Sequence, residues 1–137
     1  MYNKLFFKII LFTSITMAEV LYVPAEFSTI QGAIEASANG DSVLVSPGFY
    51  PETINFEGKS ITVTSLYLIG GDSLLIGTTI IDAQESGSVA TFSSGEDSGS
   101  KLQGFTLQNG TGNDEDPDEN GSYYTYGGGI YCENSNP

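Results

Sequence analysis

The sequence predicts an all-β protein, a β-solenoid of stacked parallel strands with one helix covering its open end. Between Phe27 and Thr64, one short amphipathic segment is followed by three strand-like runs that tight turns separate, with nothing helical between them. Strands so closely spaced favour a chain that winds along a repeating path. In such a fold the scaffold repeats and the loops carry the function, so the fold is easier to predict than the activity.

A capping helix is expected over residues 28–39. Ser28 is suited to the N-cap position, and Gln31 follows three residues later, as in a capping box. Ile30 and Ile34 lie on one stripe at helical spacing, which indicates a small apolar face. This face should lie across the strand that follows.

Strand-like segments recur along the rest of the chain. The apolar run 43–45 is followed by alternating segments at 53–56 and 60–65. Steps of 18 to 25 residues separate five apolar centres, and insertions are expected at 93–101 and 111–126. The five centres are Val43, Ile61, Ile80, Phe105 and Ile130.

The pattern STIQGAIEASANGDSVLVSPGFYPETINFEGKSITVTS, which begins at Ser28, resembles the N-terminal segment of pectin-lyase-like proteins of the secreted bacterial type. Stretches at 102–110 and 127–135 are similar to internal repeats of that family. The resemblance implies a right-handed parallel β-helix for residues 19–137, here its N-terminal part, truncated at the C-terminus. It does not specify an activity, because the family includes lyases, esterases, glycosidases and adhesins.

The first eighteen residues have the pattern of a secretory signal peptide. Lys4 precedes an apolar stretch from Leu5 to Ile15, which Lys8 interrupts and which is too short to span a membrane. The small residue Ala18 precedes the expected cleavage point. The mature chain would begin at Glu19 and be secreted or displayed at the cell surface, with no further membrane insertion. A buried N-terminal segment is the alternative.

Acidic residues dominate the charge of the chain. It contains 17 Asp and Glu against 4 Lys and Arg, no histidine, and a net charge of −13. Nucleic acids and anionic membranes are recognised by clusters of Lys or Arg, so the composition excludes both as partners. A polysaccharide or a component of a cell surface remains possible.

A candidate calcium site lies in the acidic segment NDEDPDENG, residues 113–121. Its proposed ligands are Asp114, Asp116, Asp118 and Asn120. The run from Asp116 to Gly121 matches the first half of a calcium-binding loop. The glutamate that closes such a loop at position twelve is missing. The alternative is a solvated acidic insertion that binds no metal.

Tyrosines follow the acidic segment and form the candidate carbohydrate-contact site. Tyr123, Tyr124 and Tyr126 could stack on sugar rings while neighbouring acids bind hydroxyl groups. Packing of the loop onto the scaffold is the alternative. Phe49 and Tyr50 could also contact sugar rings, but both are expected to pack against the helix cap.

Catalytic residues are not evident in this segment. Lys59 and Lys101 are expected to be solvated turn lysines, and no arginine is present to orient a pair of aspartates. A glycosidase needs only two carboxylates at a set separation, although exposed loop acids are the simpler interpretation. The candidates are Asp72, Asp82, Glu96 and Asp97.

Two functional hypotheses follow. The first is a secreted or cell-surface scaffold with a structural or carbohydrate-binding role and no complete catalytic site in this segment. The second is the N-terminal part of a polysaccharide-active lyase, esterase or glycosidase whose catalytic residues lie beyond residue 137. The single cysteine, Cys132, is expected to be buried in an apolar strand, with a disulfide to a residue beyond this chain as the alternative.

Overall fold

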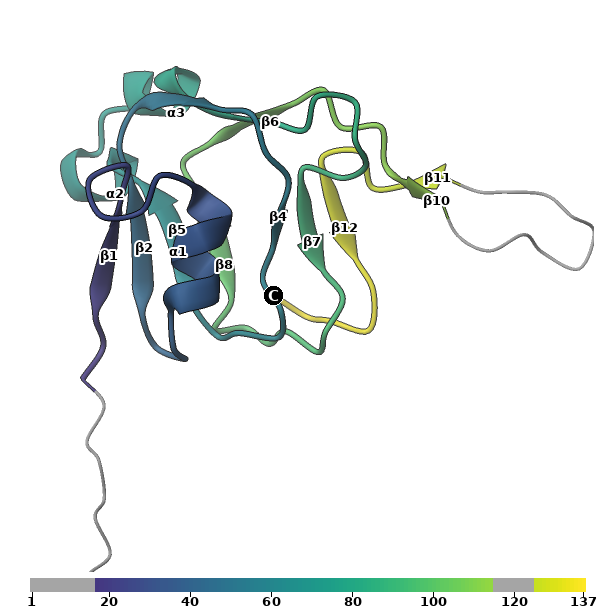
Figure 1. Ribbon diagram of the computed structural model, residues 1–137, viewed down its shortest axis with the longest axis horizontal. Helices are drawn as coiled ribbons and strands as arrows, with labels where there is room; N and C mark the ends of the chain where they lie inside the picture. The colour runs from purple at the N-terminus through teal and green to yellow at the C-terminus, as the bar shows by residue number, and fades with distance from the viewer. Residues whose placement is uncertain (1–16, 115–124) are drawn as a thin grey trace, which may run out of the picture.

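A computed structural model describes residues 17–114 and 125–137 and shows a mixed α/β protein (Figure 1). Three short helices occur in this part of the chain: α1 (Ile30–Ala36), α2 (Tyr67–Gly70) and α3 (Leu74–Thr78). None of the helices among the described residues has the length and apolar character needed to cross a membrane.

The strands form three small parallel sheets and one antiparallel pair. The sheets have the orders β1-β2-β5-β8, β3-β6-β9 and β4-β7-β12, and β10 pairs with β11. The strand bounds are β1 Val20–Val23, β2 Ser42–Val45, β3 Gly48–Tyr50, β4 Ile54–Asn55, β5 Thr62–Ser65, β6 Thr79–Asp82, β7 Ala90–Phe92, β8 Lys101–Gln103, β9 Thr106–Gln108, β10 Asn113–Asp114, β11 Thr125–Tyr126 and β12 Ile130–Cys132. Figure 1 shows β10 and β11 projecting from the body at the end opposite β1.

In-register pairing stacks aliphatic side chains inside the molecule. Val43 pairs with Leu21 on one side and with Val63 on the other, and Val63 pairs in turn with Leu102. Because alternate residues of a strand face the same side, this register directs one apolar row into a common core. Phe56 and Phe92 stack within that core, with ring centroids 4.2 Å apart.

The expected all-β fold, a right-handed parallel β-helix, is wrong. The structure has mixed α/β content, with three separate parallel sheets of three or four strands, and its described residues do not close into a solenoid. The single-helix expectation failed at residues 66–78, which form α2 and α3. The turn between these helices contains Gly71, in the left-handed conformation at φ 66°, and Asp72, whose Oδ1 accepts a hydrogen bond from the backbone N–H of Leu74 at 3.0 Å.

The predicted repeat alignment is also wrong. Val43, Ile80 and Ile130 fall in β2, β6 and β12, which belong to three different sheets. Ile61 and Phe105 lie just outside strands. Strands about 20 residues apart do pair where β1, β2 and β5 lie side by side. Ile80 and Ile130, however, pair with Phe49 and Ala90, so the five centres do not form one stack.

The capping helix is shorter than expected but packs where its apolar stripe predicts. Thr29, not Ser28, is the N-cap, and its Oγ1 accepts a hydrogen bond from the backbone N–H of Gly32 at 3.1 Å. Ile30 and Ile34 are fully buried, and α1 contacts β1, β2 and β4. The helix therefore covers the first strands of two sheets.

Candidate functional site

A cleft of about 450 Å³ lies between the loop that precedes α1 and the segment around β3. We call it the Phe49 cleft. Its lining residues are Pro24, Ser28, Thr29, Pro47, Gly48, Phe49, Tyr50, Pro51 and Glu52. The lining thus combines aromatic and proline surface with two hydroxyl groups and one carboxylate.

Strand alternation explains how the two aromatic residues of β3 differ. Tyr50 faces inward and is buried, and its hydroxyl donates to the carbonyl oxygen of Ser46 at 2.8 Å. Burial, followed by the nearby charge of Glu52, raises the pKa of the Tyr50 phenol. Phe49 faces the opposite way and is 56% exposed. Tyr50 is therefore buried, whereas the expected packing against the helix cap is wrong for Phe49.

Glu52 is held in the cleft by the helix that it caps. Its two carboxylate oxygens accept hydrogen bonds from the backbone N–H groups of Ile30 and Gln31, each at 2.9 Å. A carboxylate has about four lone-pair sites, so this pairing leaves capacity for further donors. Thr29 accepts from the backbone with its hydroxyl oxygen and keeps its own O–H as a donor.

The side chain of Gln31 ties the same helix to the outer strand β4. Its Oε1 accepts from the backbone N–H of Asn55 at 2.8 Å, and its Nε2 donates to Glu57 at 3.2 Å. These bonds fix α1, and with it one wall of the Phe49 cleft, to the sheet. The predicted capping-box role of Gln31 is therefore replaced by a contact with a distant part of the chain.

The predicted calcium and carbohydrate residues lie mostly outside the described part of the chain. Asp116, Asp118 and Asn120 are not described, and neither are Tyr123 and Tyr124. Asp114 belongs to β10, where its backbone pairs with Thr125. No group of three or more His, Cys, Asp or Glu placed to hold a metal ion occurs among the residues described.

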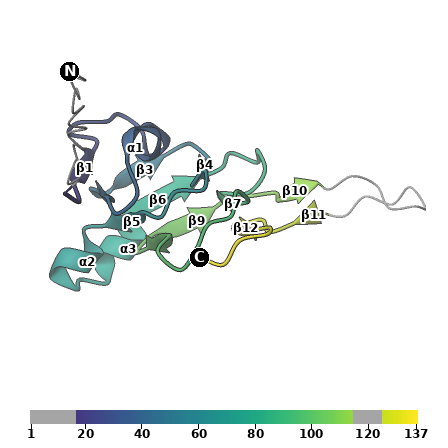
Figure 2. The same ribbon diagram turned by 90° about the horizontal axis from the view of Figure 1, so that it is seen from below.

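Tyr126, the remaining tyrosine of the predicted carbohydrate site, lies in β11 and is 46% exposed. Figure 2 shows β11 at the end of the molecule remote from β3. The structure therefore does not bring Tyr126 together with Phe49, and the two aromatic residues belong to separate surfaces.

Two of the four candidate carboxylates, Asp82 and Glu96, are buried instead of exposed. Hydrogen bonds from the side chain of Gln108 at 2.7 Å, the backbone of Gln84 at 2.7 Å and the side chain of Asn109 at 2.9 Å lower the pKa of Asp82. This carboxylate joins the turns that follow β6 and β9.

Glu96 likewise connects separate segments of the chain through hydrogen bonds. Burial acts to raise its pKa, but hydrogen bonds from Ser135 Oγ at 2.7 Å and from the backbone N–H groups of Gly58 and Ser94, each at 2.8 Å, together lower it. A glycosidase requires a general acid whose pKa is raised. The lowered pKa makes Glu96 unsuited to that role.

The two remaining candidates, Asp97 and Asp72, also accept hydrogen bonds. Hydrogen bonds from the backbone of Gly99 and from the hydroxyl of Ser60, each at 2.9 Å, lower the pKa of Asp97. Asp72 caps the turn before α3. All four carboxylates thus accept hydrogen bonds from other residues of the protein.

Comparison with known proteins gives no match to a family model, to a curated protein or to a solved structure. The functional argument therefore rests on the residues of the chain. The Phe49 cleft was missed at the level of sequence, because the exposure of Phe49 depends on which face of β3 turns toward the core. The segment PGFYP at 47–51, in which two prolines enclose a glycine and two aromatic residues, is the sequence feature that could have indicated the cleft.

Proposed function

We propose that the protein is an extracellular scaffold that binds carbohydrate through the Phe49 cleft. The observation that carries this proposal is the solvent-facing ring of Phe49 beside the hydroxyls of Ser28 and Thr29 and the carboxylate of Glu52. Sugar rings offer apolar C–H faces that pack on aromatic rings, and their hydroxyl groups both donate and accept hydrogen bonds. The extracellular location is inferred from the signal-like pattern of residues 1–18.

The charge of the site selects the class of sugar. Glu52 is the charged residue among those that line the cleft, and the chain carries a net charge of −13. An anionic uronate polymer would meet repulsion there without a Lys or Arg to offset it. We therefore infer that the ligand is a neutral polysaccharide.

Glu52 would act as a positioned acceptor. Because its oxygens already hold the N–H groups of Ile30 and Gln31, the carboxylate is fixed before the ligand arrives. Binding then costs little side-chain entropy at this residue. Hydroxyl groups of the sugar can donate to its remaining lone pairs, while the hydroxyls of Ser28 and Thr29 bind the ring substituents.

Calorimetry with neutral cello-oligosaccharides and dextran, and with polygalacturonate as the anionic comparison, tests the proposal. Phe49→Ala should weaken binding of the neutral ligand about tenfold, which corresponds to the loss of about 1.4 kcal/mol of stacking energy. Phe49→Trp should retain binding, because it keeps an aromatic face. Polygalacturonate should bind more weakly than either neutral ligand.

Tyr126→Ala is the matched control, since it removes another exposed aromatic residue at a remote site. It should leave binding unchanged. If Tyr126→Ala abolishes binding and Phe49→Ala does not, the site lies at the β10–β11 hairpin and the proposed cleft is wrong. Absence of binding to both neutral ligands would also overturn the proposal.

A further inference from the structure

A buried carboxylate holds the chain at the point where β1 begins. The backbone nitrogen of Glu19 donates a hydrogen bond to Asp41 Oδ1 at 2.8 Å, and Asp41 is only 8% exposed. The other oxygen of this carboxylate accepts from the backbone N–H of Ala38 at 2.8 Å. The carbonyl oxygen of Glu19 accepts in turn from the backbone N–H of Ser42 at 2.9 Å. The carboxylate of Asp41 is thus aligned on the nitrogen of one particular residue.

Asp41 is ionised at neutral pH and fixed in position. Hydrogen bonds from the backbone N–H groups of Ala38 and Glu19 lower the pKa of Asp41, and burial opposes them. Its own backbone N–H donates to the carbonyl oxygen of Ala38 at 3.0 Å, and its carbonyl oxygen accepts from the backbone N–H of Thr62 at 3.1 Å. A buried anion of this kind gains most from a cation that can reach it without moving it.

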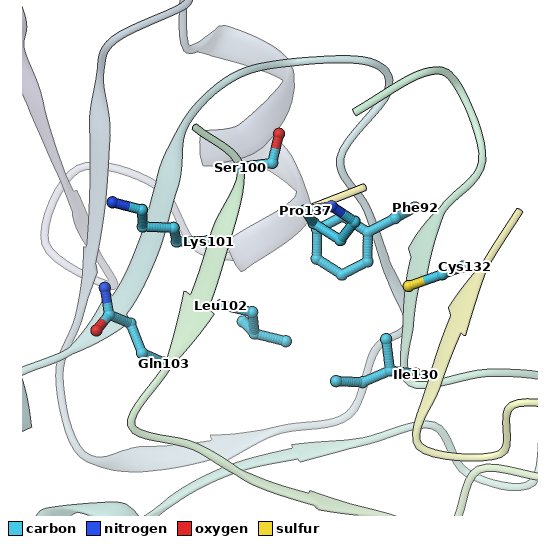
Figure 3. A pocket seen from close by; sticks show the side chains of 8 residues that line it. All are labelled: Phe92, Ser100, Lys101, Leu102, Gln103, Ile130, Cys132 and Pro137. Carbon is cyan, nitrogen blue, oxygen red and sulfur yellow. The ribbon is translucent and has the colours of Figure 1, made fainter. Parts of the chain in front are cut away.

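The lysines of the described residues are engaged or placed elsewhere. The chain has four Lys and Arg in total, and two of them lie within residues 1–18. Lys59 Nζ donates to the carbonyl oxygens of Ile34 and Glu35. Lys101 lies on β8 beside a cavity (Figure 3), and β2 and β5 separate that strand from β1. Neither lysine therefore supplies the cation for Asp41.

Glu19 is also the residue at which the mature chain is expected to begin. Ala18 and Glu19 are exposed and lie outside helices and strands. Hydrolysis of the peptide bond between them breaks its C–N bond. The oxygen of water adds to the carbonyl carbon of Ala18, which ends as a carboxylate, and the released nitrogen becomes an ammonium group. An α-amino group ordinarily titrates at about 7.7–8.0, so this one is charged at pH 7.

We propose that Ala18–Glu19 is a processing site and that the ammonium group released there forms an ion pair with Asp41, which stabilises the processed protein. Before cleavage this nitrogen is a neutral amide with one hydrogen to donate. Afterwards it carries three hydrogens and a positive charge against a buried anion. Cleavage one residue earlier would place the charge one residue away, with Cα atoms about 3.8 Å apart, and leave an amide facing Asp41.

The proposal rests on the signal-like pattern from which the extracellular part of the proposed function is inferred, but not on carbohydrate binding. The Phe49 cleft contains neither Glu19 nor Asp41. A failure to bind sugars would therefore leave the ion pair untouched, and the two proposals can fail separately.

Two chains that span residues 19–137 and 18–137 test the ion pair. They have the same net charge, and both keep the described core, which begins at Leu21. Only the shorter chain places its ammonium group on Asp41, so its melting temperature at pH 7 should be higher by about 2–4 °C. Asp41→Asn should remove this difference. Asp97→Asn is the matched control, because that carboxylate accepts its hydrogen bonds from Gly99 and Ser60, and it should lower both melting temperatures equally.

The pH dependence of the two unsubstituted chains gives a second readout. An ion pair raises the pKa of the amine in the folded state. Its contribution is therefore complete below about pH 8 and disappears as the pH rises through the higher folded value. The difference in melting temperature should vanish by about pH 10.

Other titratable groups near this end of the sheet are common to both chains. Asp41 meets the nitrogen directly, β2 has no charged side chain, β1 carries Tyr22 and α1 carries Glu35. Cys132 is exposed, contrary to the expected burial, and also titrates in alkali. Because the chains share these groups, their difference reports the amine alone.

Three outcomes would overturn the proposal. The first is equal melting temperatures at pH 7, and the second is a difference that survives Asp41→Asn or persists at pH 10. The third is secreted protein whose first residue is not Glu19.

Discussion

Lys59 Nζ donates a hydrogen bond to the carbonyl oxygen of Ile34 at 2.6 Å and a second to that of Glu35 at 2.7 Å. A turn lysine thus holds the C-terminal end of α1, while Glu52 holds the N-terminal end. A cation at the C-terminus and an anion at the N-terminus both complement the helix dipole. The expectation that Lys59 is a solvated turn residue is therefore wrong.

Replacing Lys59 with methionine should lower the free energy of unfolding by about 1 kcal/mol, because two helix carbonyls lose their charged donor while the apolar stem is kept. Chemical denaturation measures the change. Lys101→Met is the control, since Lys101 is exposed on β8, and it should have little effect. Equal effects of the two substitutions would show that the bonds to α1 do not stabilise the fold.

Ile34→Asp should destabilise the protein by about 3 kcal/mol or more. Ile34 is fully buried between α1 and the strands it covers, so the new carboxylate would lie in an apolar site without a partner. Thermal denaturation followed by circular dichroism measures the loss. The same change at Ile69, which is exposed on α2, should be tolerated, and a stable Ile34→Asp variant would contradict the packing of α1 described above.

Stability should fall in acid because of Glu96. Its pKa in the folded protein lies below the ordinary value of 4.5, so it favours folding fully above about that pH, and the contribution disappears as the pH falls through the lower folded value. Glu96→Gln should lower the melting temperature at neutral pH and flatten its decline in acid. An unchanged acid profile would show that the bonds from Gly58, Ser94 and Ser135 do not favour the ionised form.

The acidic segment 113–121 is predicted to bind calcium weakly, with a dissociation constant of about 10⁻⁴ to 10⁻³ M, because it lacks the closing glutamate. Calorimetry with calcium measures this, and Asp116→Ala and Asp118→Ala should each remove the heat of binding. Heat that survives both substitutions would place the ion elsewhere. No heat at millimolar calcium would identify the segment as a solvated insertion.

Export should remove residues 1–18, because a lysine-flanked apolar stretch ends there at small residues. N-terminal sequencing of secreted protein should begin at Glu19 or within a residue or two of it. Recovery of exported protein that still carries Met1 would contradict the prediction.

Features that depend on neighbouring residues were predictable from the sequence. The stripe of Ile30 and Ile34 indicated a covering helix, and the apolar run at 43–45 indicated the strand β2, because helical and strand periodicities are local properties. Composition likewise set the acidic character of the chain. The class of fold was not predictable in the same way, since residues 66–78 form two helices where strands and turns alone were expected.

Only the tertiary structure determines which of the candidate functional residues are buried and which are exposed. Glu96 is buried because it meets Gly58 and Ser135, each about 40 residues away in the chain. Phe49 is exposed because the register of β3 with β6 turns Tyr50 toward the core. Cys132 is exposed because β12 is an outer strand. Each outcome depends on contacts between distant segments, and local periodicity and composition carry no information about those contacts.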